Sequence, residues 1–168
     1  MNVEQLISKA FRMDEATWQR HANPWSVYTR MATLPLLIVA VWSRAWWGWW
    51  ALVPIMLVLL WTWLNPRLFP PPQSTNNWAS KAVLGERVWL NRKAVPVPKH
   101  HQILPNILSA IAALGGVVMI YGLVKLEICP TLLGAIFAFL AKLWFVDRMV
   151  WLYDDMSATH ETYRSWLY

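Results

Sequence analysis

The chain has 168 residues, of which 57% are hydrophobic, only 14% are charged and 14 are tryptophan. A soluble domain of this length has too little interior for so many large rings, whereas a membrane protein offers them a lipid-facing surface and two interfaces. The single cysteine, Cys129, excludes an internal disulfide and a multi-cysteine metal site, and we attribute the net charge of +6 to membrane topology rather than to nucleic-acid binding.

Residues 1–30 contain no long apolar run, which argues against a cleaved signal peptide. Apolar residues instead recur at helical spacing near the start of the chain: Val3, Leu6, Ile7, Ala10 and Phe11. This pattern predicts an amphipathic helix over 3–11, which either lies on the membrane surface or packs against the rest of the domain. Asp14 is placed to cap a short second helical turn that carries Trp18.

Two apolar stretches, 31–43 and 46–64, predict a first transmembrane hairpin over 31–64. The second stretch has 19 residues, enough to span a hydrocarbon core of roughly 30 Å. The first is shorter and spans only if the turn between them lies in the headgroup layer; a re-entrant pair is the alternative. Tryptophans suited to such an interface cluster around this turn: Trp42, Trp46, Trp47, Trp49 and Trp50.

The longest polar part of the chain, 65–102, predicts a cytoplasmic loop. It opens with a stiff, proline-rich connector over 69–72. Asn77 can cap a helix from Trp78 to about Asn91. We expect this helix to lie along the membrane with its basic side chains turned toward phosphates or solvent.

Stretches 103–124 and 131–146 predict a second transmembrane hairpin over 103–146. The third span carries a stripe of small residues that permits close approach of another helix: Ser109, Ala110, Ala112, Ala113, Gly115 and Gly116. The fourth helix is expected to continue beyond the membrane into a cytoplasmic tail over 147–168. The predicted fold is an all-α membrane protein of one domain, 1–168, with four transmembrane helices in two hairpins, an N-terminal amphipathic helix and an interfacial helix in the central loop.

The distribution of lysine and arginine predicts the orientation. Twelve of them lie in 1–30, 65–102 and 147–168, Arg44 and Lys125 lie at the opposite turns, and one lies inside the fourth span. Because basic residues accumulate on the cytoplasmic side, we expect a multi-pass protein of the inner (plasma) membrane with both termini cytoplasmic. The expected partners are membrane lipids, with other membrane proteins or further copies of the chain as alternatives; nucleic acid is not expected.

All four histidines lie outside the apolar spans: His21, His100, His101 and His160. That argues against a haem held by histidines within the bilayer, and the cofactor, if any, stays unknown. His100 and His101 are neighbours with no further histidine three or four residues away, so their spacing predicts no metal site. Histidines and carboxylates on one side of the membrane are nevertheless the residue types of an acid–base site.

The segment 18–30, W-x-x-H-A-N-P-W-S-V-Y-T-R, is the most distinctive in the chain. Its Asn-Pro pair indicates a turn, after which Ser26 can cap the helix of the first span. The segment either only anchors that helix at the interface, or His21, Asn23 and Arg30 face a pocket for an anionic head group or a cofactor.

Two further segments carry candidate residues. Segment 85–92 is either a surface helix with an ion pair or the cover of such a pocket, with Glu86 as its acid. Asp147 and Asp154 share one face of the fourth helix, and Asp147 is expected to pair with an arginine, Arg30 or Arg67. The candidate ligand- or head-group-binding residues are His21, Asn23, Arg30, Glu86, Arg87, His100, His101, Asp147 and Asp154, of which His21, Glu86 and Asp154 are also the candidate catalytic residues.

The motifs in 18–30, 85–92 and 151–154 resemble those of a family of small bacterial and archaeal membrane proteins known only as a domain of unknown function. The resemblance extends over nearly the whole chain and implies no activity, substrate or cofactor. The lack of a nucleophile elbow, a phosphate loop or a zinc-protease motif favours a non-enzymatic component. We therefore expect an accessory, scaffold or lipid-binding membrane protein; the alternative is a membrane enzyme that acts on a lipid-like or quinone-like substrate at its cytoplasmic interface.

Overall fold

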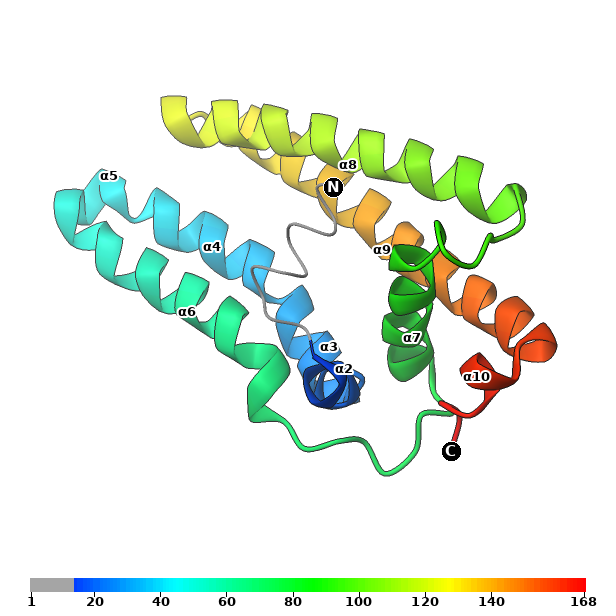
Figure 1. The fold of residues 1–168 in the computed structure, drawn as a ribbon. Helices are drawn as coiled ribbons and strands as arrows, with labels where there is room; N and C mark the ends of the chain where they lie inside the picture. The colour runs from blue at the N-terminus through cyan, green and yellow to red at the C-terminus, as the bar shows by residue number, and fades with distance from the viewer. Residues whose placement is uncertain (1–13) are drawn as a thin grey trace. The chain divides into compact units, whose positions relative to one another are not determined.

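The computed structural model describes residues 14–168, and in this part of the chain the regular structure is helical, without any strand (Figure 1). The all-α prediction is therefore confirmed, whereas the amphipathic helix predicted over 3–11 lies outside the described residues. In chain order the elements are α2 (Glu15–His21), α3 (Pro24–Met31), α4 (Thr33–Trp42), α5 (Arg44–Trp47), the 3-10 helix η1 (Gly48–Ala51), α6 (Leu52–Leu68), α7 (Trp78–Leu90), α8 (His100–Lys125), α9 (Ile128–Thr159) and α10 (Glu161–Arg164).

The described residues form two compact units. The polar unit consists of 14–29, Trp63–Gln102 and Val146–Tyr168, and the apolar unit consists of Arg30–Thr62 and Ile103–Phe145. Each boundary between the units lies within two residues of a boundary expected between an apolar hairpin and a polar segment. Contacts within the chain thus divide it at nearly the same places as its hydropathy does.

In the apolar unit, α4 and α5 lead into a reversal of the chain at Gly48. This residue has φ +52°, a value that glycine adopts readily and that strains a residue with a Cβ. The short helix η1 follows, and α6 then runs back along α4 (Figure 1). The tryptophans at the reversal are solvent-exposed, and 86% of the Trp49 surface is accessible. The turn therefore carries an exposed tryptophan cluster where the sequence predicts one.

Helices α8 and α9 form the second, antiparallel hairpin of the apolar unit (Figure 1). A Cβ on Gly122 would lie 2.4 Å from the backbone nitrogen of Thr131, and a Cβ on Gly115 would lie 2.6 Å from that of Ala138. Glycines therefore let the two backbones touch, as small residues do in close helix pairs. Of the predicted stripe, Gly115 takes part in this contact, whereas Gly116 has nothing within 4 Å of a Cβ position.

Arg44 joins the two hairpins of the apolar unit near their turns. Its guanidinium donates to the carbonyl of Leu123 and, at 2.7 Å, to the carbonyl of Val124. Both carbonyls belong to the last turn of α8, beyond the reach of its i→i+4 bonds, and the Leu123 carbonyl also accepts from the backbone N–H of Leu126 at 3.4 Å. A cation is also favoured at this end of a helix, so one side chain satisfies α8 and ties it to α5.

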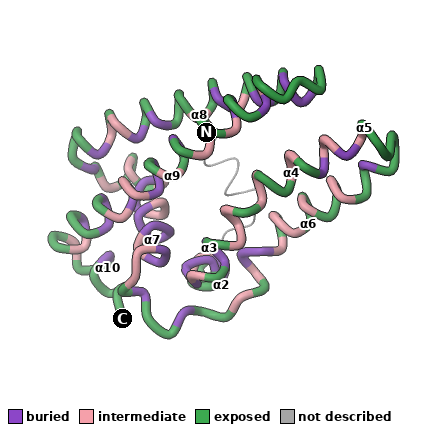
Figure 2. Tube along the Cα trace, turned by 180° about the vertical axis from the view of Figure 1, so that it is seen from behind, coloured by how far each residue is buried: buried purple, intermediate pink, exposed green. Residues whose placement is uncertain are grey.

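Three helical stretches are long and apolar enough to cross a membrane: Pro24–Leu68, His100–Lys125 and Ile128–Thr159. The first has 45 residues and includes the reversal at Gly48, so it consists of two arms. Exposed residues recur along α4, α6 and α8 (Figure 2). They include many large apolar side chains, among them Leu36, Val39, Leu57, Leu114 and Val117.

Helix α7 forms much of the core of the polar unit. Its predicted start and cap are confirmed, since Oδ1 of Asn77 accepts from the backbone N–H of Ser80 at 2.9 Å. Eight of its 13 residues are buried, Val88 and Trp89 almost completely. The sequence predicts a helix along the membrane surface and does not predict this burial. The burial arises because α7 packs closely on α9, with Gly85 facing the backbone of Met149.

Candidate functional site

The most distinctive motif of the sequence folds into α2, a turn and α3, and its polar side chains make a chain of hydrogen bonds. His21, Ser26 and Asn65 are all buried. Nδ1 of His21 lies 2.9 Å from Oγ of Ser26, and the Ser26 hydroxyl donates to Oδ1 of Asn65 at 2.8 Å. The Asn65 amide donates to Oγ1 of Thr29 at 2.8 Å, and the Thr29 hydroxyl donates to the carbonyl of Trp25 at 2.5 Å.

The direction of each of these bonds follows from the number of protons. Thr29 gives its one hydroxyl proton to a carbonyl, so it must accept from the amide of Asn65. Asn65 therefore presents its oxygen to Ser26, and Ser26 uses its only proton there. His21 must then donate from Nδ1, so it cannot act as the base that activates Ser26. The chain of bonds is a link between α2, α3 and α6.

The prediction that Ser26 caps the helix of the first span is wrong, because Ser26 lies inside α3 and bonds to Asn65. Asn23 holds the start of α3 in its place. Its Oδ1 accepts from the backbone N–H of Trp25 at 2.9 Å, and its Nδ2 donates to the carbonyl of Pro70 at 3.0 Å. Asn23 thus fixes the helix start to the proline-rich connector.

The turn between α2 and α3 is bonded to α7 as well. The buried hydroxyl of Ser80 donates to the carbonyl of Ala22 at 2.6 Å. Arg30, at the end of α3, is half-buried, and its carbonyl accepts from the hydroxyl of Thr33 at 2.6 Å. The contacts of His21 and Asn23 thus hold the turn and the start of α3 to neighbouring segments of the chain.

Arg87 forms the ion pair that one interpretation of segment 85–92 expects. Its guanidinium donates to both carboxylate oxygens of Glu15 on α2, at 2.8 Å to Oε1, and lies 4.0 Å from the centroid of the Trp166 ring. Glu86 is half-buried on α7, beside Arg87. This segment thus connects α7 with α2 and with the C-terminal residues.

Asp147 has partners other than those expected from the sequence. It accepts a hydrogen bond from Nε1 of Trp78 at 3.1 Å and lies 3.6 Å from the guanidinium of Arg148. Arg67, one of the expected partners, lies over the ring of Trp63, 4.3 Å from its centroid. Trp78 of α7 is therefore a partner of Asp147, in place of the arginine that the sequence predicts.

The three candidate catalytic residues belong to different parts of the polar unit. His21 bonds to Ser26, and Asp154 forms an ion pair with Lys81 at 2.9 Å. Glu86 lies on a third element, α7, where it is half-buried. The structure gives His21 and Asp154 separate sets of partners, so the two do not form one acid–base pair.

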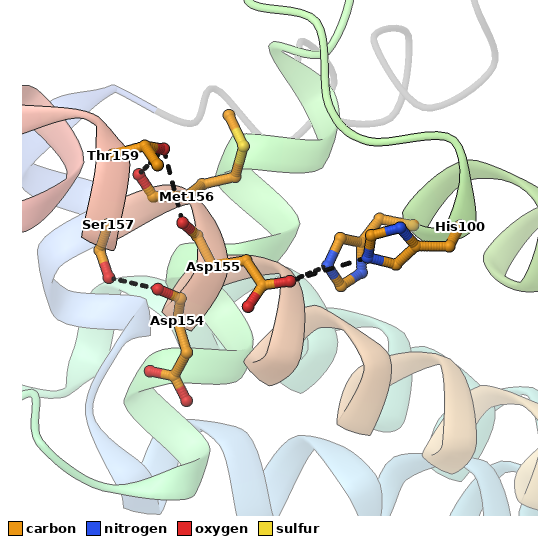
Figure 3. A network of polar contacts seen from close by, with 7 residues as sticks. His100, Asp154, Asp155, Met156, Ser157 and Thr159 are labelled. Carbon is orange, nitrogen blue, oxygen red and sulfur yellow. Dashed lines mark hydrogen bonds and ion pairs between the residues drawn. The ribbon is translucent and has the colours of Figure 1, made fainter.

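A second cluster lies where the start of α8 meets the far end of α9. Nε2 of His101 lies 2.7 Å from Oδ2 of Asp155, and Nε2 of His100 lies 3.7 Å from the same oxygen. Figure 3 shows the contacts from both imidazoles converging on this carboxylate. His101 is 5% exposed, whereas His100 and Asp155 are exposed. One donor atom from each of the three lies within 4.8 Å of the others.

The electrostatics of the cluster favour an ionised carboxylate. The hydrogen bond with His101 is the main cause that holds the pKa of Asp155 below its ordinary value of 3.8; partial burial opposes it, and His100 adds a smaller contribution. Asp155 is therefore an anion at neutral pH, with two imidazoles beside it. Such a group can orient His101, or it can share a cation with both histidines.

Sequence reasoning singled out His100, His101 and Asp154, but it missed Asp155 as a site residue. Asp154 and Asp155 are neighbours in α9 and project from it in different directions. Which of the two faces the histidines depends on how α9 packs in the fold, and the sequence does not show this. His100 and His101 also begin α8 rather than end a loop, because that helix starts three residues before the predicted span.

The described part of the chain is thus all-helical: it contains apolar helices long enough to cross a membrane and a unit in whose core several polar side chains are buried. The chain belongs to the family of unknown function DUF6653, which matches residues 2–166. The prediction that the chain is a member of a family of unknown function is therefore confirmed. No curated protein and no solved structure matches the chain.

Proposed function

We propose that this chain is a four-span membrane protein whose polar unit lies on the cytoplasmic side, and that it serves as a non-enzymatic accessory or scaffold component. The observation that carries the proposal is the apolar surface of both hairpins. Large side chains such as Val39, Leu57, Leu114 and Leu140 are at least half exposed on α4, α6, α8 and α9. Exposed apolar area on this scale marks a surface that meets lipid or other proteins.

The helix lengths support four spans. Helix α8 has 26 residues and α9 has 32, which at 1.5 Å per residue correspond to about 39 Å and about 48 Å. The first arm of the other hairpin is longer than α4 alone, since Ala32 between α3 and α4 has helical angles, φ −71° and ψ −12°. Helix α6 adds 17 residues, about 25 Å, and η1 leads into it. A hydrocarbon core of about 30 Å is within reach of all four.

The positions of the charges support the orientation. The turns of the two hairpins carry Arg44 and Lys125, whereas the polar unit carries most of the other basic residues. Arg44 is moreover bonded to carbonyls of α8. A strong excess of basic residues on one side is typical of the cytoplasmic side, so we assign the polar unit and both termini to the cytoplasm.

The hydrogen bonds of the polar unit favour a scaffold over an enzyme. The buried hydroxyl of Ser26 has a histidine beside it, yet its proton is already given to Asn65. Asn23 and Ser80 are bonded to backbone carbonyls. Polar groups that are bonded to one another and to backbone carbonyls hold the segments of this unit together, which suits a component that binds a membrane partner rather than one that performs chemistry.

The proposal is tested with a photoreactive amino acid placed at Leu114, which is 68% exposed, and at Leu108 of the same helix, which is 1% exposed. We expect irradiation of intact membranes to give a discrete protein adduct, with another membrane protein or a second copy, from Leu114 and not from Leu108. Adducts with lipid alone from Leu114 would contradict the scaffold role and favour a lipid-binding one. Equal adducts from both positions would contradict the assignment of the exposed face.

A further inference from the structure

The cluster of His100, His101 and Asp155 has the makeup of a metal site. It combines two imidazole nitrogens with one carboxylate oxygen, and all three donor atoms lie within 4.8 Å of one another. Three protein ligands of these types, with a position left for water, recur in sites for zinc and related ions. We propose that these residues bind one divalent transition-metal ion of the zinc class.

Two of the three donor separations are close to the value that a bound ion requires, and the third, between the two imidazoles, lies within 4.8 Å. Zinc binds imidazole and carboxylate donors at about 2.0–2.1 Å, which in tetrahedral geometry separates two donors by about 3.3 Å. The donor separations from Asp155 are 2.7 Å for His101 and 3.7 Å for His100, one shorter and one longer than this value. Shifts of about half an ångström, within the freedom of the exposed His100 and Asp155 side chains, make the two equal.

The surroundings hold the donors ready. His101 is buried, and its Nε2 is already directed at Asp155, so its ring orientation is set without the ion. The ring centroids of His100 and His101 are 4.2 Å apart, which places both imidazoles on the same side of the carboxylate. Asp154, the neighbouring carboxylate, pairs with Lys81 and leaves Asp155 to the histidines. A bound ion takes the place of the Nε2 proton between His101 and Asp155, and the neutral imidazole then carries its one proton on Nδ1.

The donor set determines the class of ion. Mg²⁺ and Ca²⁺ prefer sites made of oxygen ligands, and Mg²⁺ keeps several waters. Two imidazoles with one carboxylate suit Zn²⁺ and neighbouring ions such as Co²⁺. The ion joins the first turn of α8 to the last part of α9, two segments that the chain separates by more than fifty residues. A bound ion would therefore cross-link α8 and α9 within the polar unit, at residues whose spacing in the sequence predicts no metal site.

The test uses the full-length chain without a polyhistidine tag, purified in mild detergent, stripped with a chelator and then dialysed against micromolar Zn²⁺ or Co²⁺. We expect one ion per chain, retained in excess Mg²⁺, and a Co²⁺ absorption spectrum of low coordination number. Asp155→Asn and His100→Ala should each weaken binding at least about tenfold. His160→Ala is the matched control, because the His160 ring contacts Thr159 and Tyr163 and no donor atom of the cluster, so its loss should not change binding.

His100 is 70% exposed at its side chain, so its replacement tests binding even if Asp155→Asn disturbs the fold. Thermal unfolding of the metal-free variants checks this point. The proposal is overturned if the wild-type chain binds no stoichiometric Zn²⁺, or if the folded variants bind as tightly as the wild type. Loss of binding in the His160 variant would place the ion elsewhere and overturn it as well.

Discussion

Gly85 of α7 lies so close to α9 that a Cβ on it would be 1.9 Å from the carbonyl oxygen of Met149. The obstacle is backbone, which cannot rotate away as a flexible side chain can. Gly85→Ala should therefore force α7 and α9 apart and lower the stability of the detergent-solubilised protein. Overpacking of this kind costs about 1–3 kcal/mol, and we expect the upper half of that range in SDS-titration unfolding.

Gly116→Ala is the matched control for this substitution. Gly116 is also inside a helix, but a Cβ there meets nothing within 4 Å. We expect it to change stability by no more than about 0.5 kcal/mol in the destabilising direction. Equal losses from both substitutions would contradict the α7–α9 contact as the cause, since the methyl group added at Gly116 meets nothing and the higher helix propensity of alanine favours the folded state.

The Ser26 hydroxyl connects His21 with Asn65, and its removal leaves two polar groups without their partner. Ser26→Ala should cost about 1–3 kcal/mol, the desolvation penalty of buried unsatisfied groups. Ser109→Ala should cost much less, because Ser109 bonds only to the carbonyl of Pro105 in its own helix. The two variants are compared by SDS titration, and a Ser26→Ala protein as stable as the wild type would refute the buried chain of hydrogen bonds.

Asp14 caps α2, and Thr17 bonds to it through its hydroxyl and, at 2.8 Å, through its backbone N–H. These bonds hold the pKa of Asp14 below its ordinary value of 3.8, the hydroxyl bond being the larger cause. A depressed pKa in the folded state means that the contribution of Asp14 to stability is present above pH 3.8 and lost as the pH falls through the folded pKa.

An NMR titration of the Asp14 carboxyl carbon measures this shift directly. We expect a midpoint below 3.8 in the wild type and a midpoint closer to 3.8 in Thr17→Val, which keeps the backbone bond and removes the hydroxyl. A wild-type midpoint at or above 3.8 would contradict the cap geometry.

Features set by neighbouring residues could be predicted from the sequence. The helix ends capped by Asp14 and Asn77 follow from local side-chain chemistry and are found where expected. The long helices α8 and α9 follow from runs of apolar residues. In each case the information lies within one helix and its flanks.

Features set by packing could not be predicted. Ser26 and Asn65 are 39 positions apart, and a serine after an Asn-Pro turn is equally typical of a helix cap. Asp155 contacts His101 because α9 packs with the side chain of Asp155, and not that of Asp154, facing the start of α8. The burial of α7 likewise depends on a partner helix that periodicity within α7 does not reveal.

The central claim, a four-span chain with a cytoplasmic polar unit, is tested most directly by the native Cys129, which is exposed beside the turn of the second hairpin. A membrane-impermeant maleimide added to intact spheroplasts should label Cys129. In the Cys129→Ser background, Ser165→Cys, at an exposed position of the polar unit, should be labelled only after permeabilisation. A Cys129 that is labelled only after permeabilisation, or a Ser165→Cys variant labelled in intact spheroplasts, would contradict the account.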